Sequence, residues 1–153
     1  MSARDLDDVR ARLNVLRAQL DAAFAPDTAA PGFRGTTPST GHCAAASVII
    51  NEELGGKFLS ATVDGVSHWF NRIRAGDNEV DIDITGDQFG FAPLQVTAKG
   101  RLYAGSRQRA QAEITVETLD RALRLAERAG LARVAAALER RVAEARRDRD
   151  RHE

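Results

Sequence analysis

Residues 38–50 read PSTGHCAAASVII and pass from a loop of turn-forming residues into an apolar, helix-forming run. Cys43, the single cysteine of the chain, stands at that transition. Backbone N–H groups at the start of a helix have no partners within the helix, and they favour a thiolate over a thiol. The stretch therefore predicts a nucleophilic thiol at the start of a helix that runs to about Leu54 and stops at Gly55-Gly56.

Three strand candidates follow this helix, separated by turn-forming residues at Asp64-Gly65 and 75–78. They cover residues 57–63, 67–73 and 79–84. Small residues on the helix allow close packing against a sheet. We expect a short antiparallel sheet behind the helix that carries Cys43.

His68 lies on the second of these strands and Asp83 on the third, so the chain order is Cys, His, Asp. A nucleophile, a base and a residue that orients the base are the parts of a catalytic triad. A hairpin that turns on Ala75-Gly76 places His68 directly opposite Asp83, about 5 Å apart at Cβ. A slip of one residue would separate them onto opposite faces. Asp83 is the first choice for the orienting carboxylate, and Asp81 is the reserve.

Each of these residues also has a plainer interpretation. A lone cysteine on an alanine-rich helix is by default a small core residue. His68 fits a half-buried polar residue beside Trp69, and the aspartates fit a charged sheet edge. A zinc site built from His42, Cys43, His68 and Asp83 is a weaker alternative, because the chain lacks the usual ligand spacings.

Helices are expected on both sides of this core. Apolar residues recur every three or four positions over 3–24, 116–129 and 131–145. Between them, 26–40 is a loop anchored by Phe33, and 88–106 reads as a packed loop. The charged tail 146–153 is expected to fray. We expect one domain over residues 1–145, with an N-terminal helix (3–24), a core (38–106) and a C-terminal helical pair (115–145).

The composition excludes several classes of function. The 153 residues carry 22 Lys and Arg against 22 Asp and Glu, so no net field attracts nucleic acid or an anionic membrane. No apolar stretch reaches the ~20 residues of a membrane span. The N-terminal residues lack the apolar core of a signal peptide, and a single cysteine suits a reducing compartment. A cytoplasmic protein is expected.

The motifs together resemble the YunG-like family of small bacterial proteins. They are Thr37-Pro38-Ser39-Thr40-Gly41-His42-Cys43-Ala44, Gly55-Gly56, Ser67-His68-Trp69-Phe70-Asn71-Arg72 and Asp83-Ile84-Thr85-Gly86-Asp87-Gln88-Phe89. The resemblance is densest from Pro38 to Gly90. This pattern is similar to the papain-like thiol superfamily, in which a Cys at a helix start faces a His and an Asp or Asn on strands. Family members often carry Gln directly before the Cys, where this chain has His42.

The resemblance implies an α+β fold with a small papain-like core, in which Cys43, His68 and Asp83 form the triad. His42, Gln88, Asp81 and Trp69 are expected as oxyanion or supporting positions. The implied activity is that of a cysteine hydrolase or acyl transferase on an amide or ester, such as a peptide or protein, without a cofactor or metal. The competing hypothesis is a non-catalytic binding or regulatory module. In that case the amphipathic terminal helices would bind a partner or a second copy of the chain.

Overall fold

The computed structural model describes residues 5–32, 37–97 and 101–151. Within these ranges the chain folds into four α-helices and a five-stranded antiparallel sheet, which makes the fold α+β as expected. The helices are α1 (Leu6–Asp21), α2 (Cys43–Leu54), α3 (Val116–Arg128) and α4 (Ala132–Arg151). The strands are β1 (Lys57–Val63), β2 (Val66–Ala75), β3 (Asn78–Asp83), β4 (Gln95–Val96) and β5 (Arg107–Arg109). Short 3₁₀ turns are η1 (Gly86–Phe89) and η2 (Gln111–Glu113).

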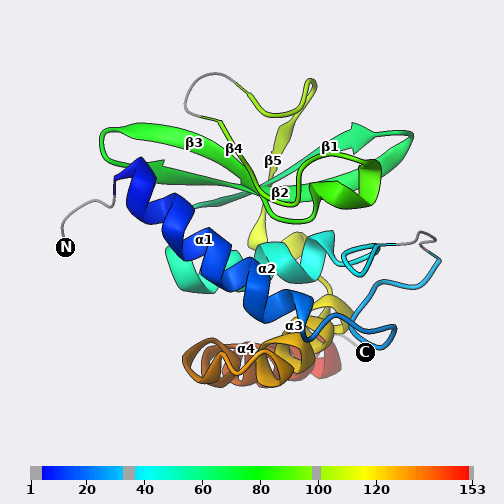
Figure 1. Cartoon of the computed structure of the whole chain (residues 1–153). Helices are drawn as coiled ribbons and strands as arrows, with labels where there is room; N and C mark the ends of the chain where they lie inside the picture. The colour runs from blue at the N-terminus through cyan, green and yellow to red at the C-terminus, as the bar shows by residue number, and fades with distance from the viewer. Residues whose placement is uncertain (1–4, 33–36, 98–100, 152–153) are drawn as a thin grey trace.

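Helix α2 forms the centre of the molecule. It packs against β2 on one side and against α3 and α4 on the other, so it lies between the sheet and the C-terminal helices (Figure 1). From Cys43 to Ile50 the residues on all of its sides are small or apolar, and Ala45, Ala46 and Val48–Ile50 are buried. A helix that is apolar all round is stable only when it is enclosed on all sides. The run AAASVII therefore dictates this central position.

Helix α1 begins later than predicted because Asp5 caps it, accepting a hydrogen bond of 2.8 Å from the Asp8 N–H. The helix ends at Asp21 rather than at residue 24. Its predicted apolar stripe packs into the main core, where Val9, Leu13, Leu16 and Leu20 are buried. Residues 3 and 4 of the expected helix and Phe33 lie outside the described residues.

The sheet order is β4-β3-β2-β1-β5. Gly56 fits the approach to β1 because a Cβ there would lie 2.3 Å from the Arg72 backbone oxygen, and its φ is +89°. The edge strands β4 and β5 are short, and β4 lies in the region expected to be only a loop. Their sequences are too brief for alternation to reveal them, so pairing with β3 and β1 defines them.

The predicted register of the β2–β3 hairpin is wrong by two residues. Ala75 pairs with Asn78, and Asn71 pairs with Ile82, so the turn residues are Gly76-Asp77, one position later than Ala75-Gly76. This moves the partner of every β2 residue by two positions along β3. A shift of two keeps each side chain on its own face, because side chains alternate with a period of two. His68 and Asp83 therefore lie on the same face of the sheet, as predicted, although the register differs.

The C-terminal pair is longer than predicted. Helix α4 continues to Arg151, beyond the expected end at 145. Ion pairs from this extension reach α3, with Arg146 to Asp120 at 2.6 Å and Arg149 to Glu117 at 3.1 Å. The charged run thus serves as the exposed face of a helix up to Arg151.

Candidate active site

His68 and Asp83 form a buried pair. The Nε2 atom of His68 donates to Oδ2 of Asp83 over 2.7 Å, and the two residues are 0% and 2% exposed. They meet diagonally across the two strands rather than directly opposite, as the shifted register requires. The pair is the Asp83 arrangement that the sequence favoured over Asp81.

The carboxylate of Asp83 accepts further hydrogen bonds. The N–H and the hydroxyl of Thr85 donate to Oδ1 over 2.9 and 3.2 Å, and the hydroxyl of Tyr103 donates to Oδ2. Gln95 in turn donates to the Tyr103 oxygen over 2.8 Å. These donors stabilise the charged form, and the pKa of Asp83 is lowered: burial raises it, but the hydrogen bond from His68 and the other donors outweigh burial.

Gly86 makes room for this network. A Cβ at Gly86 would lie 2.5 Å from Nε2 of Gln95, 3.0 Å from Oδ2 of Asp83 and 3.2 Å from the hydroxyl oxygen of Tyr103. The first of these separations is below any ordinary contact. The glycine of the Thr85-Gly86-Asp87-Gln88 motif is therefore a packing requirement of the site.

His68 lies in an aromatic enclosure and is charged. Phe89 and Tyr103 meet its ring edge to face at 4.9 and 5.5 Å. The pKa of His68 is raised to about 9: burial lowers it, but the hydrogen bond to Asp83 and the interaction with the Cys43 side chain outweigh burial. At neutral pH the ring is an imidazolium paired with a carboxylate. Its Nδ1 atom has no hydrogen-bond partner at close range among the described residues.

Cys43 is the first residue of α2 and is 5% exposed. It lines a small enclosed space together with Phe70, Asn71, Asp83 and Thr85. No side-chain hydrogen bond from the capping residue His42 occupies the first N–H groups of the helix. The thiol therefore lies at the start of a helix whose capping residue makes no side-chain hydrogen bond to it, and its side chain interacts with the His68 ring.

His42 is held in a different way. Its Nε2 atom lies 2.7 Å from the Thr28 hydroxyl, its Nδ1 atom lies 3.1 Å from the Thr40 carbonyl, and its ring contacts Phe24 at 4.4 Å. The pKa of His42 is lowered, chiefly by burial. Both ring nitrogens are engaged in fixing the loop that precedes Cys43. Neither points to a role as an oxyanion donor.

A family model described as YunG protein matches residues 12–128 of the chain. The chain belongs to the YunG family. The match includes α1 from Arg12 onward, the whole site and α3. Searches of curated proteins and of solved structures each gave no match.

In this YunG family member, Gln88 links the two halves of the site. Its Oε1 atom accepts from the Gly41 N–H over 3.2 Å, and its Nε2 atom donates to the Thr85 carbonyl over 3.0 Å. The loop before Cys43 and the turn after Asp83 are therefore held by one side chain. The sequence marked Gln88 without assigning its contacts.

A second link passes through Arg17, which the sequence treated only as part of an amphipathic helix. The Arg17 guanidinium donates to both carboxylate oxygens of Asp87, over 3.1 and 2.7 Å, and to the Ile84 carbonyl over 2.6 Å. The Ser39 hydroxyl donates to the same carboxylate over 2.5 Å. The pKa of Arg17 is raised: burial lowers it, but the hydrogen bonds to Asp87 and Asp21 outweigh burial. Helix α1 thereby positions the loop before Cys43.

Two of the expected supporting residues lie elsewhere. Asp81 accepts from Arg72 over 2.6 and 3.2 Å and from the Leu102 N–H over 3.1 Å, so its carboxylate is engaged in holding the sheet. Trp69 alternates with His68 along β2 and packs on Phe58 and the Arg109 guanidinium, at 6.0 and 5.8 Å. Neither residue contacts the His68 ring.

Tyr103 and Thr85 are the site residues whose roles the sequence missed. Both fall in stretches that the resemblance covers, but a tyrosine 20 residues after its partner carboxylate gives no local signal. Among the described residues, no group of three or more His, Cys, Asp and Glu is arranged to hold a metal ion. The helices within the described ranges also include none long and apolar enough to cross a membrane.

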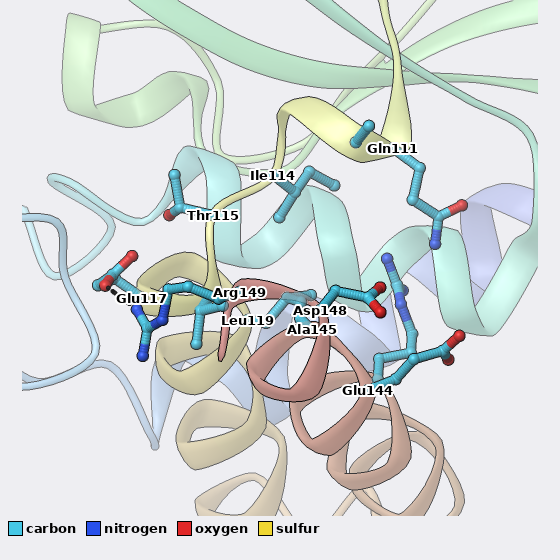
Figure 2. A pocket seen from close by; sticks show the side chains of 12 residues that line it. Gln111, Ile114, Thr115, Glu117, Leu119, Glu144, Ala145, Asp148 and Arg149 are labelled. Atoms are coloured by element: carbon cyan, nitrogen blue, oxygen red, sulfur yellow. Dashed lines mark hydrogen bonds and ion pairs between the residues drawn. The ribbon is translucent and has the colours of Figure 1, made fainter. Parts of the chain in front are cut away.

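Two cavities open outside the enclosed space. One, of about 440 Å³, is lined by Thr40, Gln88 and Phe89 and therefore borders the site. The larger, of about 750 Å³, lies between η2, α3 and α4, and its lining does not include Cys43, His68 or Asp83. Figure 2 shows Ile114 and Leu119 within this larger groove and the Glu117–Arg149 ion pair at its edge.

Proposed function

We propose that the chain is a cysteine hydrolase or acyl transferase that acts on an amide or ester bond through a papain-like arrangement of Cys43, His68 and Asp83. The observation that carries the proposal is the buried His68–Asp83 pair. The Nε2 atom of His68 binds Asp83, whereas its Nδ1 atom has no close hydrogen-bond partner among the described residues. The Cys43 side chain interacts with the same ring. A buried cation with one unpaired donor is stabilised by a nearby anion, and a Cys43 thiolate supplies one.

In the proposed reaction, the Cys43 proton resides on Nδ1 of His68, and the thiolate attacks the carbonyl carbon of the substrate. The tetrahedral intermediate collapses as His68 returns that proton to the leaving amine or alcohol, which leaves an acyl group on sulfur. Water or an acceptor nucleophile then gives its proton to His68, attacks the acyl carbon and releases the thiolate. Asp83 keeps its hydrogen bond to Nε2 throughout and so fixes the ring orientation.

The backbone N–H groups at the start of α2 are the donors that this proposal assigns to the oxyanion. A preformed donor aimed at the developing charge contributes more than one that must reorganise. His42 has no such role in the proposal, because its ring nitrogens bind Thr28 and Thr40. Gln88 and Asp87 act by holding the loop before Cys43 in place.

A non-catalytic binding module is the second candidate, and two observations favour it. Cys43 is 5% exposed, which suits a core residue. The groove of about 750 Å³ between α3 and α4 offers a partner surface remote from the cysteine. The two functions differ in what they require of the thiol, because only the hydrolase requires it to react.

The test is a pH series of iodoacetamide alkylation rates on the parent protein and on His68→Ala. Cys43 is the sole cysteine, so every modified molecule reports on it. An ordinary thiol, with a pKa near 8.5, reacts about a hundredfold more slowly at pH 6 than at pH 8.5. We expect the alkylation rate of the parent to change far less than this between pH 6 and pH 8.5. His68→Ala should restore the pH dependence of an ordinary thiol.

Asp81→Asn is the matched control, since it neutralises the other buried carboxylate of β3, which pairs with Arg72, and leaves the His68–Asp83 pair intact. Its alkylation profile should follow that of the parent. Cys43→Ser should abolish covalent labelling by ester and amide electrophiles while the protein stays folded. Equal rates for the parent and His68→Ala at every pH would contradict the hydrolase and favour the binding module.

A further inference from the structure

The cavity of about 440 Å³ borders the candidate site on two sides. Thr40 comes from the loop before Cys43, and Val66 lies two residues before His68 on β2. Phe89 belongs both to the cavity wall and to the aromatic enclosure, because its ring meets the His68 ring at 4.9 Å. A substrate whose reactive carbonyl approaches Cys43 therefore has this cavity beside it.

Among the described residues that line the cavity, Asp64 is the charged one. The other described lining residues are neutral, with Val66, Pro31 and Phe89 as apolar walls and Gln88 as an amide. Asp64 forms no ion pair with any residue of the described ranges. A cavity whose described lining has apolar walls and one carboxylate is complementary to an aliphatic chain that ends in a cation.

The β1–β2 turn explains the position of Asp64 but does not require its charge. Asp64 has a φ of +50° and precedes Gly65, as in tight hairpin turns. Asparagine adopts this conformation at least as readily as aspartate. Asp64→Asn therefore removes the charge from the cavity while it keeps the turn.

We propose that this cavity receives a lysine-like group of the substrate, an aliphatic stem with a terminal ammonium, and that Asp64 determines this specificity. The inference rests on the proposed function, since it names the substrate class of that same site. The stem lies along Val66 and Phe89, and the ammonium reaches the Asp64 carboxylate. Substrates that place a carboxylate in the cavity are disfavoured by repulsion from Asp64.

The experiment measures labelling of Cys43 by three matched electrophiles, the chloromethyl ketones of N-acetyl-lysine, N-acetyl-norleucine and N-acetyl-glutamate. At low salt we expect the lysine compound to label about fivefold faster than the norleucine compound, and the glutamate compound to label slowest. In Asp64→Asn the three rates should converge. Added salt should reduce the lysine preference of the parent, because exposed charges are screened.

Asp77→Asn is the matched control, since Asp77 lies in the β2–β3 turn and does not line the cavity. It should keep the full lysine preference. A second measurement follows the NMR signals of Val66 and Gln88 in Cys43→Ser as N-acetyl-lysine methylamide or its glutamate counterpart is added. Only the lysine compound should shift them, and Asp64→Asn should abolish the shift.

The outcomes separate the two proposals. Equal labelling of Cys43 by all three electrophiles, faster than that of an ordinary thiol, would overturn the specificity and leave the hydrolase standing. An unchanged lysine preference in Asp64→Asn would overturn the role of Asp64. Labelling no faster than that of an ordinary thiol by every compound would overturn the hydrolase, and the specificity with it.

Discussion

Two regions next to Cys43 each bury a histidine, and they hold it in opposite states. The loop before α2 encloses His42 with a threonine hydroxyl and a carbonyl, and burial lowers its pKa. The β2–β3 pair encloses His68 with the Asp83 carboxylate, and its pKa is raised to about 9 although burial lowers it. The comparison teaches that burial alone favours the neutral ring, and that one buried carboxylate reverses the outcome.

The largest effect should come from Asp83→Asn, which makes the surroundings of His68 resemble those of His42. Breaking a buried ion pair by removing one partner costs about 3–5 kcal/mol. The free energy of unfolding should fall by this amount, the pKa of His68 should fall below its ordinary value, and alkylation of Cys43 at pH 6 should slow. Urea unfolding and NMR titration of the ring measure these changes.

Asp81→Asn is the control for that experiment. Asp81 is also buried, but it pairs with Arg72 rather than with His68. We expect it to lower the free energy of unfolding while His68 keeps its midpoint near pH 9. If the pKa of His68 moved as far in Asp81→Asn as in Asp83→Asn, the contact with Asp83 would not be what distinguishes His68 from His42.

The next effect is a pair of opposite pH dependences. The folded-state pKa of His68, about 9, exceeds the reference value of 6.5, so its contribution to stability is full below pH 6.5 and is lost as pH rises through 9. The pKa of His42 is lowered, so its contribution is present above pH 6.5 and is lost as pH falls. The His68 contribution is on the order of 3 kcal/mol.

Urea unfolding of the parent, His68→Gln and His42→Gln from pH 5 to pH 9.5 measures how the free energy of unfolding depends on pH in each protein. His68→Gln should lose less stability than the parent between pH 7 and 9.5. His42→Gln should lose less than the parent between pH 6.5 and 5. If both variants reduced the pH dependence of the free energy of unfolding on the same side of neutral pH, the two histidines would not be in opposite states.

A smaller effect is expected from Tyr103→Phe. The change removes one donor from the buried Asp83 carboxylate and leaves the His68 contact in place. Loss of such a hydrogen bond costs about 1–2 kcal/mol. The pKa of Asp83 should move toward its ordinary value. Phe91→Leu, at an exposed ring 6.0 Å from Tyr103, is the control and should leave the free energy of unfolding nearly unchanged.

The smallest effect should come from Thr28→Val, which removes the hydroxyl beside Nε2 of His42. We expect the free energy of unfolding to fall by about 1 kcal/mol. The pKa of His68 should not change, because the His68–Asp83 pair does not involve Thr28. If the pKa values of His42 and His68 both changed in NMR titration of Thr28→Val, the two regions would be coupled.

Much of the fold could be predicted because its signals are local. The run from Cys43 begins with apolar residues and ends at two glycines, and β1 lies between those glycines and the Asp64-Gly65 turn, so both elements were placed at their observed bounds. The short edge strands gave no such signal. The β2–β3 turn was misplaced by one residue, which shifts the strand register by two, because several residues of 75–78 favour a turn equally well.

Two features of the sequence predicted the site: the alternation of side chains along the strands and the order of Cys43, His68 and Asp83 in the chain. Alternation along the strands was enough to group His68 with Asp83, since an error of two residues leaves the face unchanged. The contacts of Tyr103, Gln88 and Arg17 could not be predicted, because they join segments between 20 and 70 residues apart. Such contacts depend on how whole elements pack.

The sequence by itself determined that Cys43 starts an apolar helix and that His68 and Asp83 share one face of a hairpin. Both properties follow from the periodicity of helices and strands. Only the tertiary structure decided the charge on each histidine. His42 and His68 are equally buried, and the difference between them is a carboxylate that the fold brings to one ring and a hydroxyl that it brings to the other. Protonation depends on these distant neighbours because the interior offers little water to replace them.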